Sequence, residues 1–295
     1  MFFQLFLLAF IPSILILIFF FFSDKYEKEP LHLLFFCFVC GAALSIPITI
    51  LHTLFPALPR MSFNSEWLSI LYKSFIISAS VEEILKYMVV KRVAVRSKHF
   101  NEPFDGMIYY VAVAAGFAVY EDFTYILSGS AEQFFLGKQI GNMSAFHLQS
   151  LYIASIRSLP GHALFAAISG YFIALGKFKF RRRQKCFHFL ALFTGILCHG
   201  IFNSIAFGFQ EKALPLLILF LAALLVIIIF MSRQLLKASP FRKPEELLSE
   251  SEYKALGNSR EYSIGNLSMF VVLFIFVIMT ILILFYINYF ISALA

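Results

Sequence analysis

Eight long runs of apolar residues constrain the fold of this chain more than any other feature of its sequence. A helix needs about 20 predominantly apolar residues to cross a bilayer. The runs cover approximately Phe2–Phe22, Leu31–Phe55, Trp67–Val90, Asp105–Leu127, Leu151–Gly176, Cys186–Phe209, Ala213–Met231 and Leu267–Ile291. They are continuous and lack the alternation of a membrane barrel, so only helices can satisfy their backbone hydrogen bonds in lipid. The sequence therefore predicts an all-α, polytopic membrane helix bundle of about eight transmembrane helices.

The composition supports a membrane protein rather than a soluble domain. Hydrophobic residues make up 60% of the chain and charged residues only 14%, with a mean hydropathy of +0.83. A soluble domain is closer to half apolar. The net charge of +7 could suggest nucleic acid as a partner, but the basic residues cluster in alternate loops between the apolar runs. We therefore expect a lipid bilayer and no nucleic acid as the chain's surroundings.

The distribution of lysine and arginine predicts the orientation. Loops that carry excess positive charge face the cytoplasm, and two such loops are Lys91–Lys98 and Lys177–Lys185. This rule places both termini on the extracytoplasmic side. We expect a single membrane domain over residues 1–295, with a core at about 67–209. A cytoplasmic linker at about 232–266 and a final transmembrane helix at about 267–291 follow the core.

Three ionisable residues interrupt the third apolar run: Glu82, Glu83 and Lys86. A charge at membrane depth is costly unless it is paired or hydrated, so such residues are functional candidates. On a helix, Glu82 and Lys86 are i,i+4 neighbours, and Glu83 and Lys86 are i,i+3 neighbours. We expect Lys86 to pair with Glu82, the better-oriented partner, which leaves Glu83 as the candidate general base.

Polar residues in the next three runs complete the candidate site. Glu121 lies in the fourth run and His162 in the fifth, while His199 and Asn203 share a helix face in the sixth. His162 is followed on its own face by Ala166, Ser169 and Gly170, whose small side chains allow close helix approach. Counted by helical rise, Glu83 and both histidines reach compatible depths near the midplane.

Two imidazoles and several carboxylates allow two forms of hydrolytic chemistry. In one, His162, His199 and Glu121 hold one divalent metal, which we expect to be zinc, with the fourth position left to water. In the other, a carboxylate activates water without metal, and His199 with Asn203 stabilises the oxyanion. The residues alone leave both forms open.

Five motifs follow one another along the chain: Glu82-Glu83-x-x-Lys86, Pro103-Phe104-Asp105-Gly106-Met107-Ile108-Tyr109, Gly116-Phe117-x-x-x-Glu121, His162 with Gly170-Tyr171, and His199-x-x-x-Asn203. Their order resembles the PrsW family of intramembrane proteases, which is related to the CAAX prenyl endopeptidase-like membrane proteases. The resemblance implies a multi-pass peptidase of the bacterial inner membrane that cleaves a membrane-associated protein, such as an anti-sigma factor. One departure is Asp122, where the family usually has asparagine; an ionised aspartate cannot donate a hydrogen bond.

Two other functions use the same residues. Buried carboxylates and histidines also form the proton relays of ion-coupled transporters, and charges can remain in a catalytically silent scaffold to hold helices together. A transporter of the inverted-repeat type would show paired broken helices in two halves, and the glycines and prolines here do not pair in that way. The ordered motifs therefore favour the protease. The sequence does not indicate an oligomeric state.

Overall fold

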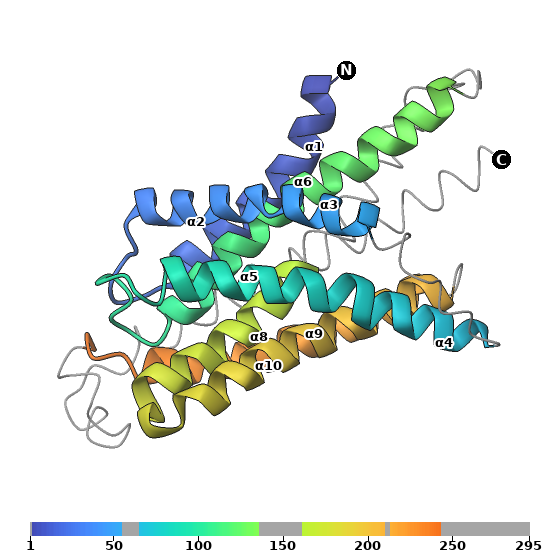
Figure 1. The fold of residues 1–295 in the computed structure, drawn as a ribbon. Coiled ribbons are helices and arrows are strands. Elements are labelled where there is room, and N and C mark those ends of the chain that lie inside the picture. Colours follow the sequence, from blue (N-terminus) through green and yellow to red (C-terminus); the bar gives the residue numbers. More distant parts are fainter. Residues whose placement is uncertain (1, 55–64, 136–160, 210–212, 243–295) are drawn as a thin grey trace. The chain divides into compact units, whose positions relative to one another are not determined.

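The structure, a computed structural model, describes residues 2–54, 65–135, 161–209 and 213–242. All secondary-structure elements in these ranges are helices (Figure 1), as the sequence predicts. The chain divides into two compact units, Met1–Ala238 and Ser239–Ala295. The predicted final transmembrane helix belongs to the second unit and lies outside the described residues.

The helices of the first unit follow one another in the order of the apolar runs. They are α1 (Phe2–Ser23), α2 (Leu31–Ala43), α3 (Ser45–Leu54), α4 (Glu66–Leu71), the π-helix η2 (Tyr72–Ala79), α5 (Ser80–Val93), α6 (Asp105–Phe135), α8 (Ala163–Ala174), the π-helix η4 (Leu175–Lys179), the 3-10 turn η5 (Arg181–Arg183), α9 (Gln184–Gly208) and α10 (Ala213–Lys237). The break between α2 and α3 has a simple cause, because Pro47 has no amide hydrogen and its ring opposes a continuous helix.

Three of the described helical stretches are long and apolar enough to cross a membrane: Leu31–Ile48, Arg181–Gly208 and Pro215–Lys237. They correspond to the second, sixth and seventh predicted runs. The segments α5 and α6 are not among them, since both carry carboxylates within their apolar sequence. The count of eight spans stays a prediction. Helix α10 ends at Lys237 rather than at Met231, and so extends into the predicted linker.

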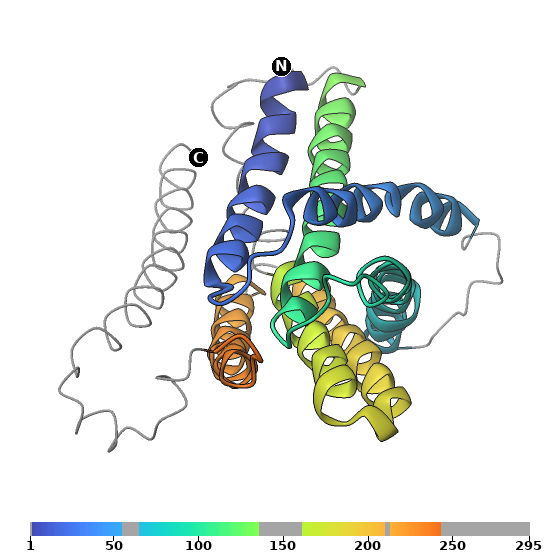
Figure 2. The same ribbon diagram turned by 90° about the vertical axis from the view of Figure 1, so that its left-hand side faces the viewer.

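Helix α6 is the centre of the first unit. Residues 102–119 are buried without interruption, because α1 and α2 pack against this segment and α8 packs against it as well. Figure 2 shows α1 and α6 side by side. Phe38 of α2 forms a cluster with Ala115 and Val119 of α6, and Ile14 and Leu17 of α1 pack against this cluster. The rod from α4 through η2 to α5 runs along α9 (Figure 1).

Two glycines set the distance between α6 and α8. A Cβ atom on Gly170 would lie 2.1 Å from the carbonyl oxygen of Gly106, and one on Gly106 would lie 2.4 Å from that of Gly170. Neither position can hold a side chain at this spacing. The predicted small-residue face after His162 thus provides the close helix contact. Next to it, the Ser169 hydroxyl donates to the Ala191 carbonyl at 2.8 Å, which links α8 to α9.

The connection between α1 and α2 is fastened to the N-terminal end of α6 by buried acids. Asp24 and Glu29 are 0% and 3% exposed. The Tyr109 hydroxyl donates to Glu29, and the carboxyl group of Asp24 has that of Glu102 as a neighbour. Burial raises the pKa of Asp24 to about 9, and the neighbouring Glu102 adds to this rise while Lys28 opposes it. Asp24 therefore keeps its proton in the folded protein at neutral pH.

Because Asp24 keeps its proton in the folded protein, the free energy of unfolding should depend on pH. The pKa of Asp24 rises from 3.8 to about 9 on folding, so the folded state binds more protons than the unfolded state between these values. The free energy of unfolding should fall as pH rises through this range, by at most about 1.4 kcal/mol per pH unit for one proton. Asp24→Asn should flatten the slope without abolishing it, because burial also raises the pKa of Glu29.

The measurement is unfolding of the detergent-solubilised protein at several values between about pH 5 and about pH 8, a window inside that range. Glu66→Gln, on the exposed surface of α4, is the matched control and should keep the wild-type slope. Equal slopes for wild type and Asp24→Asn would contradict the assignment of the proton to Asp24.

Candidate active site

Seven ionisable or polar side chains from four regions of the first unit meet in its interior. They are Glu82, Glu83 and Lys86 on α5, Glu121 on α6, His162 immediately before α8, and His199 and Asn203 on α9. These include every catalytic and metal-binding candidate predicted from the sequence. Glu121 is the least buried of the three glutamates, with 15% of its side chain exposed against 3% and 1% for Glu82 and Glu83.

Lys86 pairs with both glutamates of its own helix, which corrects the predicted pairing. Its Nζ atom lies 2.8 Å from Glu83 Oε1 and 3.4 Å from Glu82 Oε2. The sequence predicted Glu82 as the partner and kept Glu83 free as the general base. The tertiary surroundings decide otherwise, because the ammonium also contacts His162 Nδ1 at 3.1 Å and lies 4.1 Å from the centre of the Phe117 ring. The argument that selected Glu83 as the base therefore fails.

His162 is held at both ring nitrogens. Its Nε2 atom lies 2.7 Å from Glu121 Oε2, and its Nδ1 atom faces Lys86. A lysine ammonium can only donate hydrogen bonds, so Nδ1 is the acceptor in this pair. The ring proton is then on Nε2 and is donated to Glu121. This arrangement turns the Nδ1 lone pair of His162 toward α5.

His199 is oriented in a similar way by the other glutamate. Its Nδ1 atom lies 3.0 Å from Glu83 Oε1, and its Nε2 atom lies 3.8 Å from Glu82 Oε2. Because an ionised carboxylate only accepts hydrogen bonds, Nδ1 carries the proton that it donates to Glu83. In the neutral ring the lone pair is then on Nε2, the nitrogen that faces Glu82. The ring stacks on Phe165 at a centroid distance of 5.5 Å and lies edge-on to the His162 ring at 5.0 Å.

Glu82 is held by a chain of side chains that the sequence analysis did not assign. The Asn203 amide donates to the Ser78 hydroxyl at 3.0 Å, and Ser78 donates to Glu82 Oε1 at 2.9 Å. Asn203, expected to stabilise an oxyanion, is here a second neighbour of Glu82. The position of Ser78, four residues before Glu82 on a helical segment, was a signal that could have revealed this contact.

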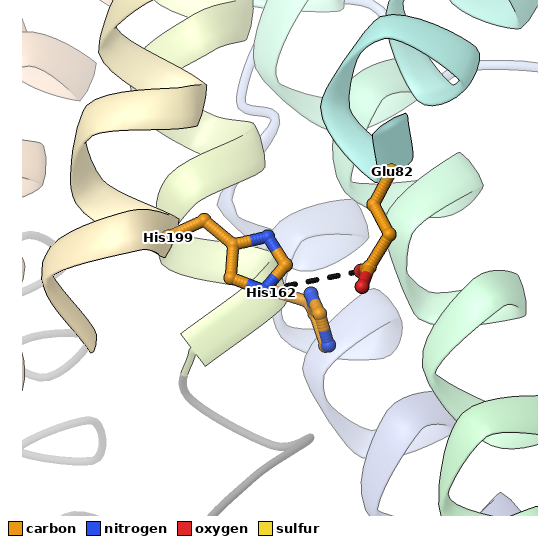
Figure 3. A group of neighbouring side chains, drawn as sticks. All are labelled: Glu82, His162 and His199. Carbon is orange, nitrogen blue, oxygen red and sulfur yellow. Dashed lines mark ion pairs between the residues drawn. The ribbon is translucent and has the colours of Figure 1, made fainter. Parts of the chain in front are cut away.

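Within the described part of the chain, Glu82, His162 and His199 form a group that could hold a metal ion (Figure 3). One ligand atom from each lies within 4.8 Å of the other two, and all three residues are buried. Two imidazoles and one carboxylate are a donor set that suits catalytic zinc, which keeps a further position for water. The predicted set had Glu121 in place of Glu82, whereas Glu121 contacts the outer nitrogen of His162. The donor set of Glu82, His162 and His199 thus fits a divalent ion.

Each of the two histidines also contacts a glutamate other than Glu82. Histidines that bind metals in proteins have the same kind of carboxylate partner. Metal-binding histidines usually donate their other ring N–H to a carboxylate, which fixes the tautomer and the orientation of the ring. Glu121 serves His162 in this way and Glu83 serves His199. The site can thus present two fixed imidazole lone pairs and one carboxylate to a cation.

Comparison with known proteins identifies what the chain is similar to. The sequence model of one protein family, the PrsW family of intramembrane metalloproteases, matches residues 29–232 of this chain. A protein named Protease PrsW from Clostridioides difficile is 35% identical over 225 residues, covering 75% of this chain and 87% of the relative. Protease PrsW from Bacillus subtilis is 25% identical and covers 66% of this chain and 78% of the relative. No solved structure matches the chain.

Proposed function

The chain belongs to the PrsW family of intramembrane metalloproteases, and from this premise we propose that Glu82, His162 and His199 hold a divalent ion, zinc, at the place of peptide hydrolysis. The protein is a membrane peptidase and not the ion-coupled transporter that the buried charges alone allowed. The observation that carries the proposal is the convergence of these three ligand atoms within 4.8 Å in a buried site.

Each residue of the site has a distinct task in this proposal. When bound, a divalent ion supplies a Lewis acid that polarises a carbonyl group or activates a water. Glu83 and Glu121 fix the two imidazoles through the hydrogen bonds at 3.0 Å and 2.7 Å. Ser78 and Asn203 hold Glu82 in place.

The substrate class is a membrane-associated protein. A site enclosed by helices excludes bulk water, which strengthens the electrostatic interactions that stabilise charge during hydrolysis. An anti-sigma-factor-like protein, the type that the sequence resemblance implies, is the first substrate to test.

The test of the proposal is cleavage of a single-span membrane protein by the purified enzyme in proteoliposomes. We expect cleavage to stop when a chelator removes divalent ions and to return when zinc is added. Zinc content, measured in parallel, should be near one ion per chain, as expected for a single site of this kind. Full activity in a preparation free of divalent metal would refute the metal site and leave the carboxylate mechanism.

For the membrane topology we propose eight spans with both termini outside, in the inner membrane of a bacterium. The support is the positive charge of the loops Lys91–Lys98 and Lys177–Lys185, which favours the cytoplasm. A membrane-impermeant thiol reagent added to intact cells should therefore miss Cys186, an exposed thiol at the start of α9. It should also miss a cysteine at Lys98, which is exposed too.

The control is a cysteine at Asn142, in the segment Ser128–Ser150, which the topology places outside the cell. The structure assigns residues up to Phe135 to α6, and the rest of this segment lies outside the described residues. This position should react with the same reagent from outside, in a background where the native cysteines other than the one tested are replaced by serine. Labelling of Cys186 in intact cells would reverse the orientation.

A further inference from the structure

Lys86 lies in the interior of the site, and its ammonium group has an acceptor for each of its N–H donors. Its ammonium has three N–H donors, and three acceptors surround it: Glu83 Oε1 at 2.8 Å, His162 Nδ1 at 3.1 Å and Glu82 Oε2 at 3.4 Å. The centre of the Phe117 ring lies 4.1 Å from Nζ, a cation–π contact. Lys86 is 1% exposed, so it does not share this position with solvent.

Two of these three acceptors are also proposed ligands of the divalent ion. Ligand atoms of zinc lie only about 2 Å from the ion. An ion held by Glu82 and His162 would therefore be a close neighbour of an ammonium that already contacts both residues. Two cations this close in a buried site repel each other strongly, because the surroundings screen them little. The contacts of Lys86 and those of the ion are mutually exclusive at these two residues.

We propose that Lys86 is a resident cation that holds the ligands of the metal-free site and withdraws from Glu82 and His162 when the divalent ion binds. The inference rests on the proposed function, since it assumes the same three ligands. Glu83, the nearest acceptor and not a ligand, keeps the ammonium after the exchange. The flexible four-carbon stem of lysine permits this small movement. Lys86 thereby lowers the affinity for the ion and spares the metal-free protein a pair of uncompensated buried carboxylates.

The test compares metal affinity in wild type with that in Lys86→Met, which keeps much of the length of the side chain and removes its charge. Zinc affinity of each full-length protein in detergent is measured by competition with a chromophoric chelator. We expect Lys86→Met to bind zinc at least about tenfold more tightly, because a like-charge contact is removed. Lys86→Arg should not gain affinity. Lys91→Met is the matched control, because Lys91 is exposed on the same helix, and it should bind zinc as wild type does.

Thermal unfolding gives a second readout that is independent of activity. Without zinc, Lys86→Met should unfold at a lower temperature than wild type, and zinc should raise its unfolding temperature by more than it raises that of wild type. Recovery of folded Lys86→Met only from cells supplied with zinc would also support the proposal. Failure to obtain folded protein from either Lys86→Met or Lys86→Gln, with zinc or without it, would overturn it by making Lys86 an obligatory structural cation.

The outcomes separate this inference from the proposed function. If wild type binds zinc and Lys86→Met binds it no more tightly, the inference is overturned and the proposed metal site stands. If neither protein binds zinc, both are overturned. Zinc binding by Lys86→Met alone supports the inference.

Discussion

Replacing Glu82 by glutamine is expected to reduce peptide cleavage by about 10²–10⁴-fold, the range typical for loss of a group that acts directly on the reacting atoms. Glutamine keeps the shape of the side chain and loses the charge that pairs with a cation. Glu82 is also the only proposed ligand held by Lys86, His199 and Ser78 together. The variant should therefore lose bound zinc as well as activity. Cleavage of a single-span substrate and zinc content of the purified protein are the two measurements.

Glu121→Gln makes this prediction specific. Glu121 orients His162 through its outer nitrogen, so the glutamine variant should lower cleavage or zinc affinity by about 10–100-fold, less than Glu82→Gln does. Glu66→Gln should retain both properties. Wild-type cleavage by the Glu82→Gln variant would refute the site as we propose it.

Placing alanine at Gly170 is expected to destabilise the first unit by about 3 kcal/mol or more, at the upper end of what overpacking costs. The added Cβ would meet the Gly106 carbonyl oxygen at 2.1 Å, so α6 and α8 must separate. Their separation would also pull His162 away from Glu121, and cleavage should fall together with stability. Unfolding in detergent, followed by circular dichroism, measures the first effect.

Gly161→Ala is the matched control for this substitution. A Cβ there would meet the Phe165 ring at 3.5 Å and the Phe202 ring at 3.9 Å, both ordinary contacts. Since alanine favours helix by about 1 kcal/mol over glycine, the control should be as stable as wild type or more stable. Equal stability of the Gly170→Ala and Gly161→Ala variants would show that the close approach of α6 and α8 is not required.

Local spacing on single helices made much of the site predictable. Glu82, Glu83 and Lys86 had to meet because residues three and four apart share a helix face. The small residues after His162 indicated a close helix contact, and Gly170 makes it. Motif order along the chain indicated which helices belong to one site, even though spacing within a helix cannot reveal contacts between helices.

Contacts between helices explain what the sequence analysis missed. Orientation on an isolated helix favoured Glu82 as the partner of Lys86, but His162 and Phe117, which are remote in sequence, draw the ammonium closer to Glu83. The exchange of Glu121 for Glu82 in the group of metal ligands has the same origin. Which nitrogen of His162 faces which carboxylate depends on how α5, α6 and α8 pack, and no local pattern encodes that.

The division of the chain into two units has a consequence for engineering. Every residue of the site lies in the unit Met1–Ala238, and the family match ends at residue 232. Among the described residues, no side chain of the site comes from the unit Ser239–Ala295. We therefore expect a tag or reporter fused after Ser239 to disturb the site less than one inserted within residues 29–232, which the family match covers.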